Sequence, residues 1–156
     1  MRWTDVVQAS ASVVSILVTL GGFFLLLRQL RNVDRTIQGD TNASLCQQSL
    51  EILNAMLSRQ ECYPYFYENQ ELPDDDPKRI QILYITEMVA NYLDLVALQR
   101  TNLPTSVWNR WRNFIQDTIK ASPVVRKHLT THAHWYSEEL EQLVKQNSDC
   151  SAVTKA

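Results

Sequence analysis

The most apolar part of the chain lies near its N-terminus. The 22 residues from Val6 to Leu27, between Asp5 and Arg28, carry no charge. As an α-helix they would extend about 33 Å, which matches the hydrocarbon thickness of a bilayer. No small-x-small cleavage pattern follows, and only Arg2 is basic before the segment, which disfavours a cleavable signal peptide. The pattern therefore predicts one N-terminal transmembrane helix.

Basic residues are distributed unevenly about this segment. Arg28, Arg31 and Arg35 follow it closely, whereas on its N-terminal side Arg2 and the α-amino group are offset by Asp5. The cytoplasmic flanks of membrane helices are enriched in Lys and Arg. The sequence therefore predicts a single-pass topology with the N-terminus outside and the C-terminal part in the cytoplasm.

Polar and small residues recur along the predicted membrane helix at spacings of 3, 4, 3, 4 and 3. This polar seam consists of Asp5, Gln8, Ser12, Ser15, Thr19 and Gly22. A 3.5-residue period keeps one face toward a partner, and small or hydroxylated residues are common where membrane helices meet. The polar seam predicts self-association, with its side chains at the helix contact or around a central lumen. The alternative is that its hydroxyl groups bond only to carbonyls of their own helix.

Beyond this segment, apolar residues at three- and four-residue spacings predict an all-α chain. The membrane helix is expected to continue as a stalk, giving a first region at 1–38, with a break at Gly39. A cytosolic bundle of about five helices is expected over 39–146, followed by a flexible tail at 147–156. The five expected helices cover about 41–60, 78–100, 105–121, a shorter stretch from 123 through 129, and a last one after 137.

Helix starts can be located from the side chains that cap them. Thr105 or Ser106, Ser122 and Ser137 are expected N-caps, and Pro123 follows the second of these at a favourable position. The 78–100 helix is expected to bury one apolar face. That face comprises Ile80, Leu83, Tyr84, Met88, Tyr92, Leu95 and Val96 or their near neighbours. The tryptophans expected in the core, rather than on a base-stacking surface, are Trp108, Trp111 and Trp135.

Composition narrows the possible functions. The 156 residues are 45% hydrophobic, and 15 Lys and Arg against 17 Asp and Glu give a net charge of −2, which disfavours general nucleic-acid binding. Cys46, Cys62 and Cys150 are an odd number at wide spacings, which favours a reducing compartment over a disulfide framework. No serine, cysteine or lysine has a recognisable catalytic base in a known motif, so an enzyme is not the leading interpretation.

One helix near the C-terminus carries candidate chemistry. Arg126 and His132 are separated by five residues, which resembles the Arg-x(4–6)-His signature of helical HEPN ribonucleases, with Lys127 at a position that is usually polar in that family. The resemblance implies that His132 acts on the attacking 2′-hydroxyl and that Arg126 stabilises the phosphorane. His128 and His132 also have metal-binding spacing, with His134 nearby, but no accompanying Glu or Cys, so we expect no metal and no cofactor. The alternative for all of them is a solvated helix face.

The order of features along the chain also resembles a known group. It includes the stalk Arg28-Gln-Leu-Arg-Asn, an aromatic-proline turn after Cys62, a helix opening at Lys78-Arg79, Trp108-Asn-Arg-Trp111, Ser122-Pro123 and Trp135-Tyr-Ser-Glu-Glu-Leu. This order is similar to that of uncharacterised bacterial single-span membrane proteins with a cytosolic helical domain of unknown function. In layout alone, the chain is similar to the membrane accessory proteins of RNA-targeting CRISPR systems, which form rings with a pore.

These resemblances imply a protein of the bacterial inner (plasma) membrane, with a role in bacterial defence suggested by the second. The leading interpretation is a single-pass protein that self-assembles through its transmembrane helix and acts as a scaffold, signalling partner or pore. Its expected partners are the lipid bilayer and further copies of itself. A different protein is an additional candidate partner. The alternatives are a membrane-tethered HEPN-like ribonuclease and an anchor whose aromatic groove near Tyr63 to Tyr67 binds a partner helix.

Overall fold

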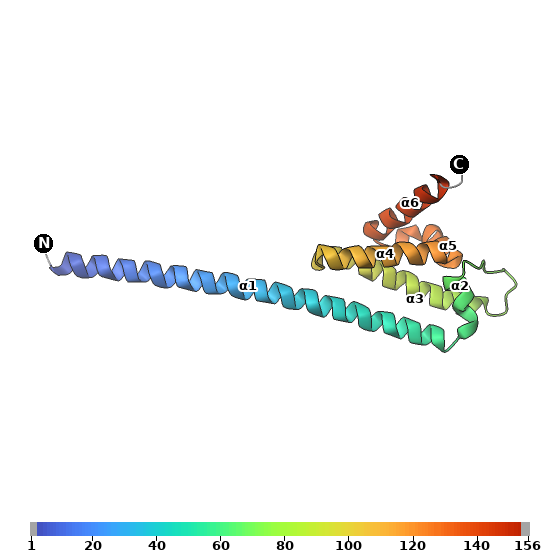
Figure 1. Ribbon diagram of the computed structural model, residues 1–156, viewed down its shortest axis with the longest axis horizontal. Helices are drawn as coiled ribbons and strands as arrows, with labels where there is room; N and C mark the ends of the chain where they lie inside the picture. Colours follow the sequence, from blue (N-terminus) through green and yellow to red (C-terminus); the bar gives the residue numbers. More distant parts are fainter. Residues whose placement is uncertain (1–2, 154–156) are drawn as a thin grey trace. The chain divides into compact units, whose positions relative to one another are not determined.

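The computed structural model describes the backbone of residues 3–153 and the side chains of residues 20–147. Every regular element in this part is helical, so the all-α prediction is confirmed (Figure 1). The α-helices are α1 (Trp3–Leu57), α2 (Tyr63–Tyr67), α3 (Arg79–Leu98), α4 (Thr105–Ala121), α5 (Pro123–Thr131) and α6 (Glu138–Val153). Short 3-10 turns occupy Gln60–Cys62, Gln99–Asn102 and Ala133–Trp135.

Helix α1 runs through the position where a break was predicted, so the prediction of a break at Gly39 is wrong. A glycine that ends a helix usually has a positive φ. No glycine in the described backbone has a positive φ. One glycine in a helix interior costs only about 1 kcal/mol relative to alanine. The helical hydrogen bonds on both sides of Gly39 are therefore maintained, and Figure 1 shows α1 as one continuous ribbon.

Contacts within the chain divide it into two units, Met1–Asp40 and Thr41–Ala156. The boundary falls inside α1, so this helix contributes to both units. The predicted division has its first boundary at residue 38, two residues before the one found here. At the other end, α6 continues to Val153, through much of the segment predicted as a flexible tail.

Among the residues whose side chains the structure describes, no helix contains an apolar stretch long enough to cross a membrane. Only Leu20–Leu27 of the predicted span has described side chains, and residues 6–19 lie outside them. The polar-seam residues Asp5, Gln8, Ser12, Ser15 and Thr19 also lie outside the described side chains. The transmembrane helix therefore stays a prediction.

The second unit is organised around α3, which packs against α4, α5 and α6. Its Ile82, Leu93 and Val96 are fully buried, together with Ile115 and Ile119 of α4, Val125 of α5 and Leu140 of α6. The last turns of α1 join this core, because Leu45 is buried and its carbonyl accepts a 2.9 Å hydrogen bond from the Tyr92 hydroxyl. Residues 41–57 are therefore part of the bundle, although they belong to the same helix as the stalk.

Two of the predicted caps are confirmed. The Ser122 hydroxyl accepts from the backbone N–H of Val125 at 3.3 Å and donates to the Tyr65 carbonyl at 2.8 Å, so it begins α5 and ties that helix to α2. The Ser137 hydroxyl likewise accepts from the N–H of Leu140 at 3.3 Å, while it donates to an Asp94 carboxylate oxygen of α3 at 2.5 Å. Each cap thus also joins two elements of the bundle.

The prediction of Thr105 or Ser106 as the cap of α4 is wrong, because the helix already begins at Thr105. Pro104 stands at the N-cap position in an extended backbone conformation. Its carbonyl accepts from the N–H groups of Val107 and Trp108, at 2.9 and 2.8 Å. The proline itself therefore starts the helix, without a side-chain cap.

The buried face of α3 differs from the predicted one. Tyr92 and Val96 are buried as expected, but Ile80 and Tyr84 are 72% and 67% exposed, and Met88 is also exposed. Ile82, Ile85, Thr86, Val89 and Leu93 take their places in the core. Apolar residues occur around most of this helix, so helical spacing alone does not single out one face.

The three tryptophans predicted in the core have different surroundings. Trp108 and Trp111 are partly buried and pack against the core of the bundle. Trp135 is 57% exposed, so the prediction of a core position is wrong for this residue. It lies in the 3-10 turn between α5 and α6, where its ring stacks on His132 rather than on the core.

Candidate functional site

A cavity of about 490 Å³ lies between α5 and the segment that leads into α3. Its wall carries five basic side chains, which are Arg79 of α3 and Arg126, Lys127, His128 and His132, contributed by α5 and its C-cap. We call this cavity the basic cleft. Glu71 is the acidic residue that lines it. In a chain with a net charge of −2, this is a local concentration of positive charge.

Arg79 is oriented by the loop that precedes α3. Its Nη1 forms a 2.6 Å ion pair with a carboxylate oxygen of Asp74 and donates to the Pro73 carbonyl at 3.2 Å. A guanidinium group has five N–H donors, and these two contacts use only one of its nitrogens. The Nε–H and the two N–H bonds of Nη2 remain for a ligand in the cleft.

Arg126 is oriented in a similar way by the end of α4. Its Nη1 donates to the carbonyl oxygens of Ile119 and Lys120, at 3.3 and 3.4 Å, in the last turn of that helix. A cation near these carbonyls also interacts favourably with the helix dipole. Arg126 therefore has a structural contact on one nitrogen while its side chain lines the basic cleft.

The two histidines of the cleft lie one helical turn apart, with ring centroids separated by 4.8 Å. His128 Nε2 is 2.9 Å from the hydroxyl of Tyr136, within hydrogen-bond distance. His132 stacks on Trp135 with ring centroids 4.1 Å apart and an angle of 20° between the planes. Burial lowers the pKa of His128, and the neighbouring His132 lowers it further, whereas Glu87 has a smaller opposing effect.

The stability of the bundle should therefore depend on the protonation of His128. Because its folded pKa lies below the ordinary 6.5, the unfolded chain binds this proton more readily. The stabilising contribution is complete above pH 6.5 and is lost as the pH falls through the folded pKa. When the pH is lowered from about 7.5 to about 5.5, the melting temperature should decrease less for His128→Gln than for the parent chain. Circular dichroism measures both melting temperatures.

His134→Gln is the matched control for this experiment, because His134 is exposed and does not line the basic cleft. It should show the same pH dependence as the parent chain. Equal slopes for His128→Gln and the parent chain would contradict the prediction.

The structure brings Arg126 and His132 to one cavity, and it adds a residue that sequence reasoning missed. Arg79 is 47 positions before Arg126 in the chain, and no local motif connects the two. Lys127, noted in the sequence only as a departure from the HEPN pattern, also lines the cleft. Of the polar seam, only Gly22 lies within residues 20–147, and a Cβ added there would meet no described atom within 4 Å.

Neither of the described cysteines lines the basic cleft. Among the described residues, no group of three or more His, Cys, Asp or Glu is arranged to hold a metal ion. Cys46 and Cys62 are free thiols, the first exposed and the second buried. Burial raises the pKa of the Cys62 thiol, which makes it a weaker nucleophile.

An apolar groove of about 260 Å³ lies on another part of the bundle, between α1, α2, α3 and α4. Its walls include Leu53 and Met56 of α1, Phe66 and Tyr67 of α2, and Phe114 of α4. The rings of Tyr63 and Tyr67 stack with centroids 4.7 Å apart, but only Tyr67 of this pair lines the groove. The binding of a partner helix here stays a prediction.

Comparisons with protein family models, with curated proteins and with solved structures found no match to this chain. The resemblance to bacterial single-span proteins therefore stays a prediction.

Proposed function

We propose that this chain is a single-pass membrane protein that self-assembles through α1 and holds its helical bundle in the bacterial cytoplasm. Assembly would gather several bundles at one point of the membrane, as a scaffold, a signalling complex or the rim of a pore requires. An exposed apolar stripe on the described part of α1 is the main support for this proposal. The basic residues Arg28, Arg31 and Arg35 support the orientation.

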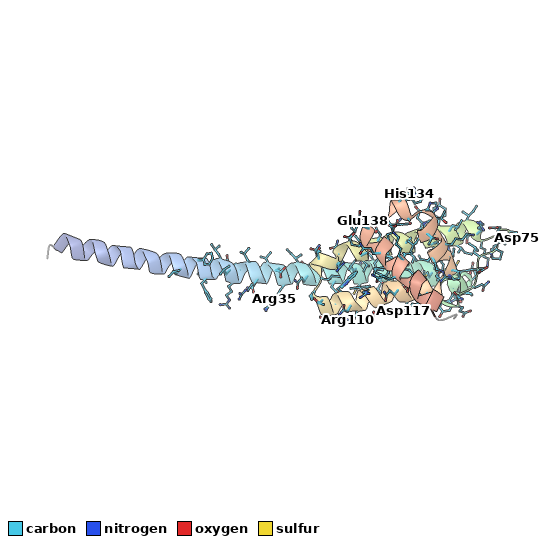
Figure 2. The ribbon with its side chains drawn as sticks, turned by 90° about the horizontal axis from the view of Figure 1, so that it is seen from above. Arg35, Asp75, Arg110, Asp117, His134 and Glu138 are labelled. Atoms are coloured by element: carbon cyan, nitrogen blue, oxygen red, sulfur yellow. The ribbon has the colours of Figure 1, made fainter. Side chains whose placement is uncertain are left out.

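The apolar stripe consists of residues at spacings of 3, 4, 3 and 4, and we call it the stalk seam. Its members are Phe23, Leu26, Leu30, Val33 and Ile37, which are 51–64% exposed in the single chain. This repeat corresponds to alternate a and d positions of a coiled coil, whose apolar side chains pack between helices. Arg28, Arg31 and Arg35 lie off the stripe, and Figure 2 shows Arg35 projecting from α1. Leu30, Val33 and Ile37 lie beyond the predicted membrane segment, where lipid would not cover them, so a further copy of α1 is their natural cover.

The stalk seam continues the polar seam of the predicted membrane segment. Ser12 and Thr19 are seven residues apart, and two further steps of seven lead to Leu26 and Val33. The two seams thus share one of their two heptad positions. One face of a continuous helix would mediate contact both in the membrane and in the stalk.

Self-assembly through the stalk can be tested with a single buried charge. We expect the full-length protein in detergent to form a particle containing several copies of the 18.1 kDa chain, measured by light scattering after size exclusion. Leu30→Glu should reduce the particle mass, because it would place like charges where the apolar side chains meet. Asn32→Glu adds the same charge off the seam and should leave the mass unchanged. A monomeric parent chain, or equal masses for all three proteins, would contradict the proposal.

A second candidate function is a membrane-tethered ribonuclease of the HEPN-like type, with His132 as acid or base and Arg126 as the group that stabilises charge. The position of both residues on the wall of one cleft favours it. Incubation with single-stranded RNA tests this candidate directly. Cleavage that is lost in His132→Ala and retained in His134→Ala would support it, and intact RNA would reject it.

A further inference from the structure

The basic cleft has a charge pattern that the proposed self-assembly does not use. Arg79, Arg126 and Lys127 are permanent cations, and His128 and His132 become cations on protonation, whereas Glu71 is the carboxylate on the wall. Asp74, which pairs with Arg79, is almost fully exposed and does not line the cleft. The wall therefore carries more positive than negative charge at every pH at which Glu71 is ionised. An anion would relieve the repulsion among these cations.

The two arginines are already oriented for such a ligand. Nη1 of Arg79 donates to one backbone carbonyl and to Asp74, and Nη1 of Arg126 donates to two backbone carbonyls. This arrangement leaves Nε and Nη2, the edge of the guanidinium group that forms paired hydrogen bonds with phosphate or carboxylate oxygens. Because the side chains are restrained before binding, less conformational entropy is lost when a ligand is bound.

The number of cations favours phosphate over a carboxylate. A phosphate monoester carries between one and two negative charges near neutral pH and has three strong acceptor oxygens. Three permanent cations in one cleft match this group better than they match the single charge of a carboxylate. Lys127 is exposed, so its ammonium group can move to the ligand without leaving a buried partner.

The size and apolar part of the cleft indicate that the phosphate belongs to an organic molecule. About 490 Å³ is within the usual range for small-molecule sites, roughly 300–1,000 Å³, and far exceeds the needs of one inorganic ion. Leu72, Leu83 and Val124 supply apolar wall beside the cations. We propose that the basic cleft binds a small organic phosphate of nucleotide size. This proposal does not depend on self-assembly through α1.

The proposal is tested by calorimetry on the full-length protein in detergent, with AMP as the probe. AMP should bind, inorganic phosphate should bind more weakly, and adenosine, which lacks the phosphate, should not bind. Lys127→Gln should weaken AMP binding about tenfold, as expected for the loss of one charged contact in the cleft. Arg79→Lys keeps the charge but removes the paired donors, so it should also weaken binding.

Lys145→Gln is the matched control, because Lys145 lies on α6, pairs with Glu141 and does not line the basic cleft. It should bind AMP like the parent chain. Circular dichroism and the particle mass should be unchanged in Lys127→Gln, which separates a lost ligand site from lost folding or assembly. In a second measurement, proton NMR should show His128 titrating at higher pH when AMP is bound, because a nearby anion favours the imidazolium form.

Several results would overturn the proposal. The first is that neither AMP nor phosphate binds at concentrations up to about 10 mM. The second is that adenosine binds as tightly as AMP. The third is that Lys145→Gln loses as much affinity for AMP as Lys127→Gln. A single-stranded RNA of about ten nucleotides that binds more tightly than AMP, and is weakened by Lys127→Gln, would also overturn it. That outcome would assign the cleft to nucleic acid instead of a small molecule.

Discussion

Trp111→Ala should lower the free energy of unfolding of the bundle by about 3 kcal/mol, the lower end of the range for removing a tryptophan that packs on a core. The indole Nε1 donates to the Asn42 side-chain oxygen at 3.1 Å. Its ring makes edge-to-face contacts with Tyr92 and Phe114, with centroids 6.3 and 5.8 Å away. A domain of this size is stabilised by only about 5–15 kcal/mol, so the loss is large. Urea denaturation followed by circular dichroism measures it.

Two milder variants separate the contributions of Trp111. Trp111→Phe retains an aromatic ring but removes the hydrogen bond to Asn42, while Asn42→Ala removes only its acceptor. Each change at the hydrogen bond should cost about 1 kcal/mol, in addition to any loss of packing in the Phe variant. A cost below about 1 kcal/mol for Trp111→Ala would show that the indole is a surface group that does not hold α1 to α4.

Replacing both Ser15 and Thr19 by leucine should reduce the particle mass of the full-length protein. These residues belong to the polar seam, and leucine adds bulk where membrane helices are expected to approach each other. Interhelical hydrogen bonds in membranes contribute only about 0.6 kcal/mol on average, so loss of close packing in every subunit should dominate. Val14→Leu with Val18→Leu adds one methylene group at each of two positions on the neighbouring face and should leave the mass unchanged, because lipid can accommodate it.

If the assembly encloses a water-filled pore, the polar seam should also be reactive from water. A cysteine that replaces Gln8 or Thr19 should react with a water-soluble thiol reagent, so these variants should be labelled more strongly than the parent chain, which has its own cysteines. Cysteine at Val14 should remain protected by lipid. Equal protection at all three positions, with an unchanged mass for the Ser15→Leu and Thr19→Leu double variant, would leave α1 as a simple membrane attachment.

Several features of the fold were predictable from the sequence because their causes are local. A hydroxyl at the N-cap needs only the backbone N–H three residues later, so Ser122 and Ser137 could be recognised without knowledge of the rest of the chain. The helical periodicity of apolar residues likewise predicted an all-α fold. The stalk seam can also be recognised from residue spacing alone, because its five members lie within 15 residues of one helix.

Other features depended on contacts between distant parts of the chain. Helical spacing predicts that α3 has an apolar face, but α4, α5 and α6 determine which apolar residues become core, so Ile82 is buried while Ile80 and Tyr84 are exposed. Trp135 is apolar in any sequence pattern, yet the turn between α5 and α6 directs its ring toward His132 and solvent. Burial is a property of the packed bundle, and hydropathy alone does not specify it.

The basic cleft shows the same limit for function. Sequence spacing placed His128 and His132 on one face of a predicted helix that also carries Arg126, because residues four apart are neighbours on a helix. Only the packing of α3 against α5 brings Arg79 to the same cavity, and only the end of α4 orients the guanidinium group of Arg126. A charged cleft arises from residues that meet across helices, and no local pattern records which helices will meet.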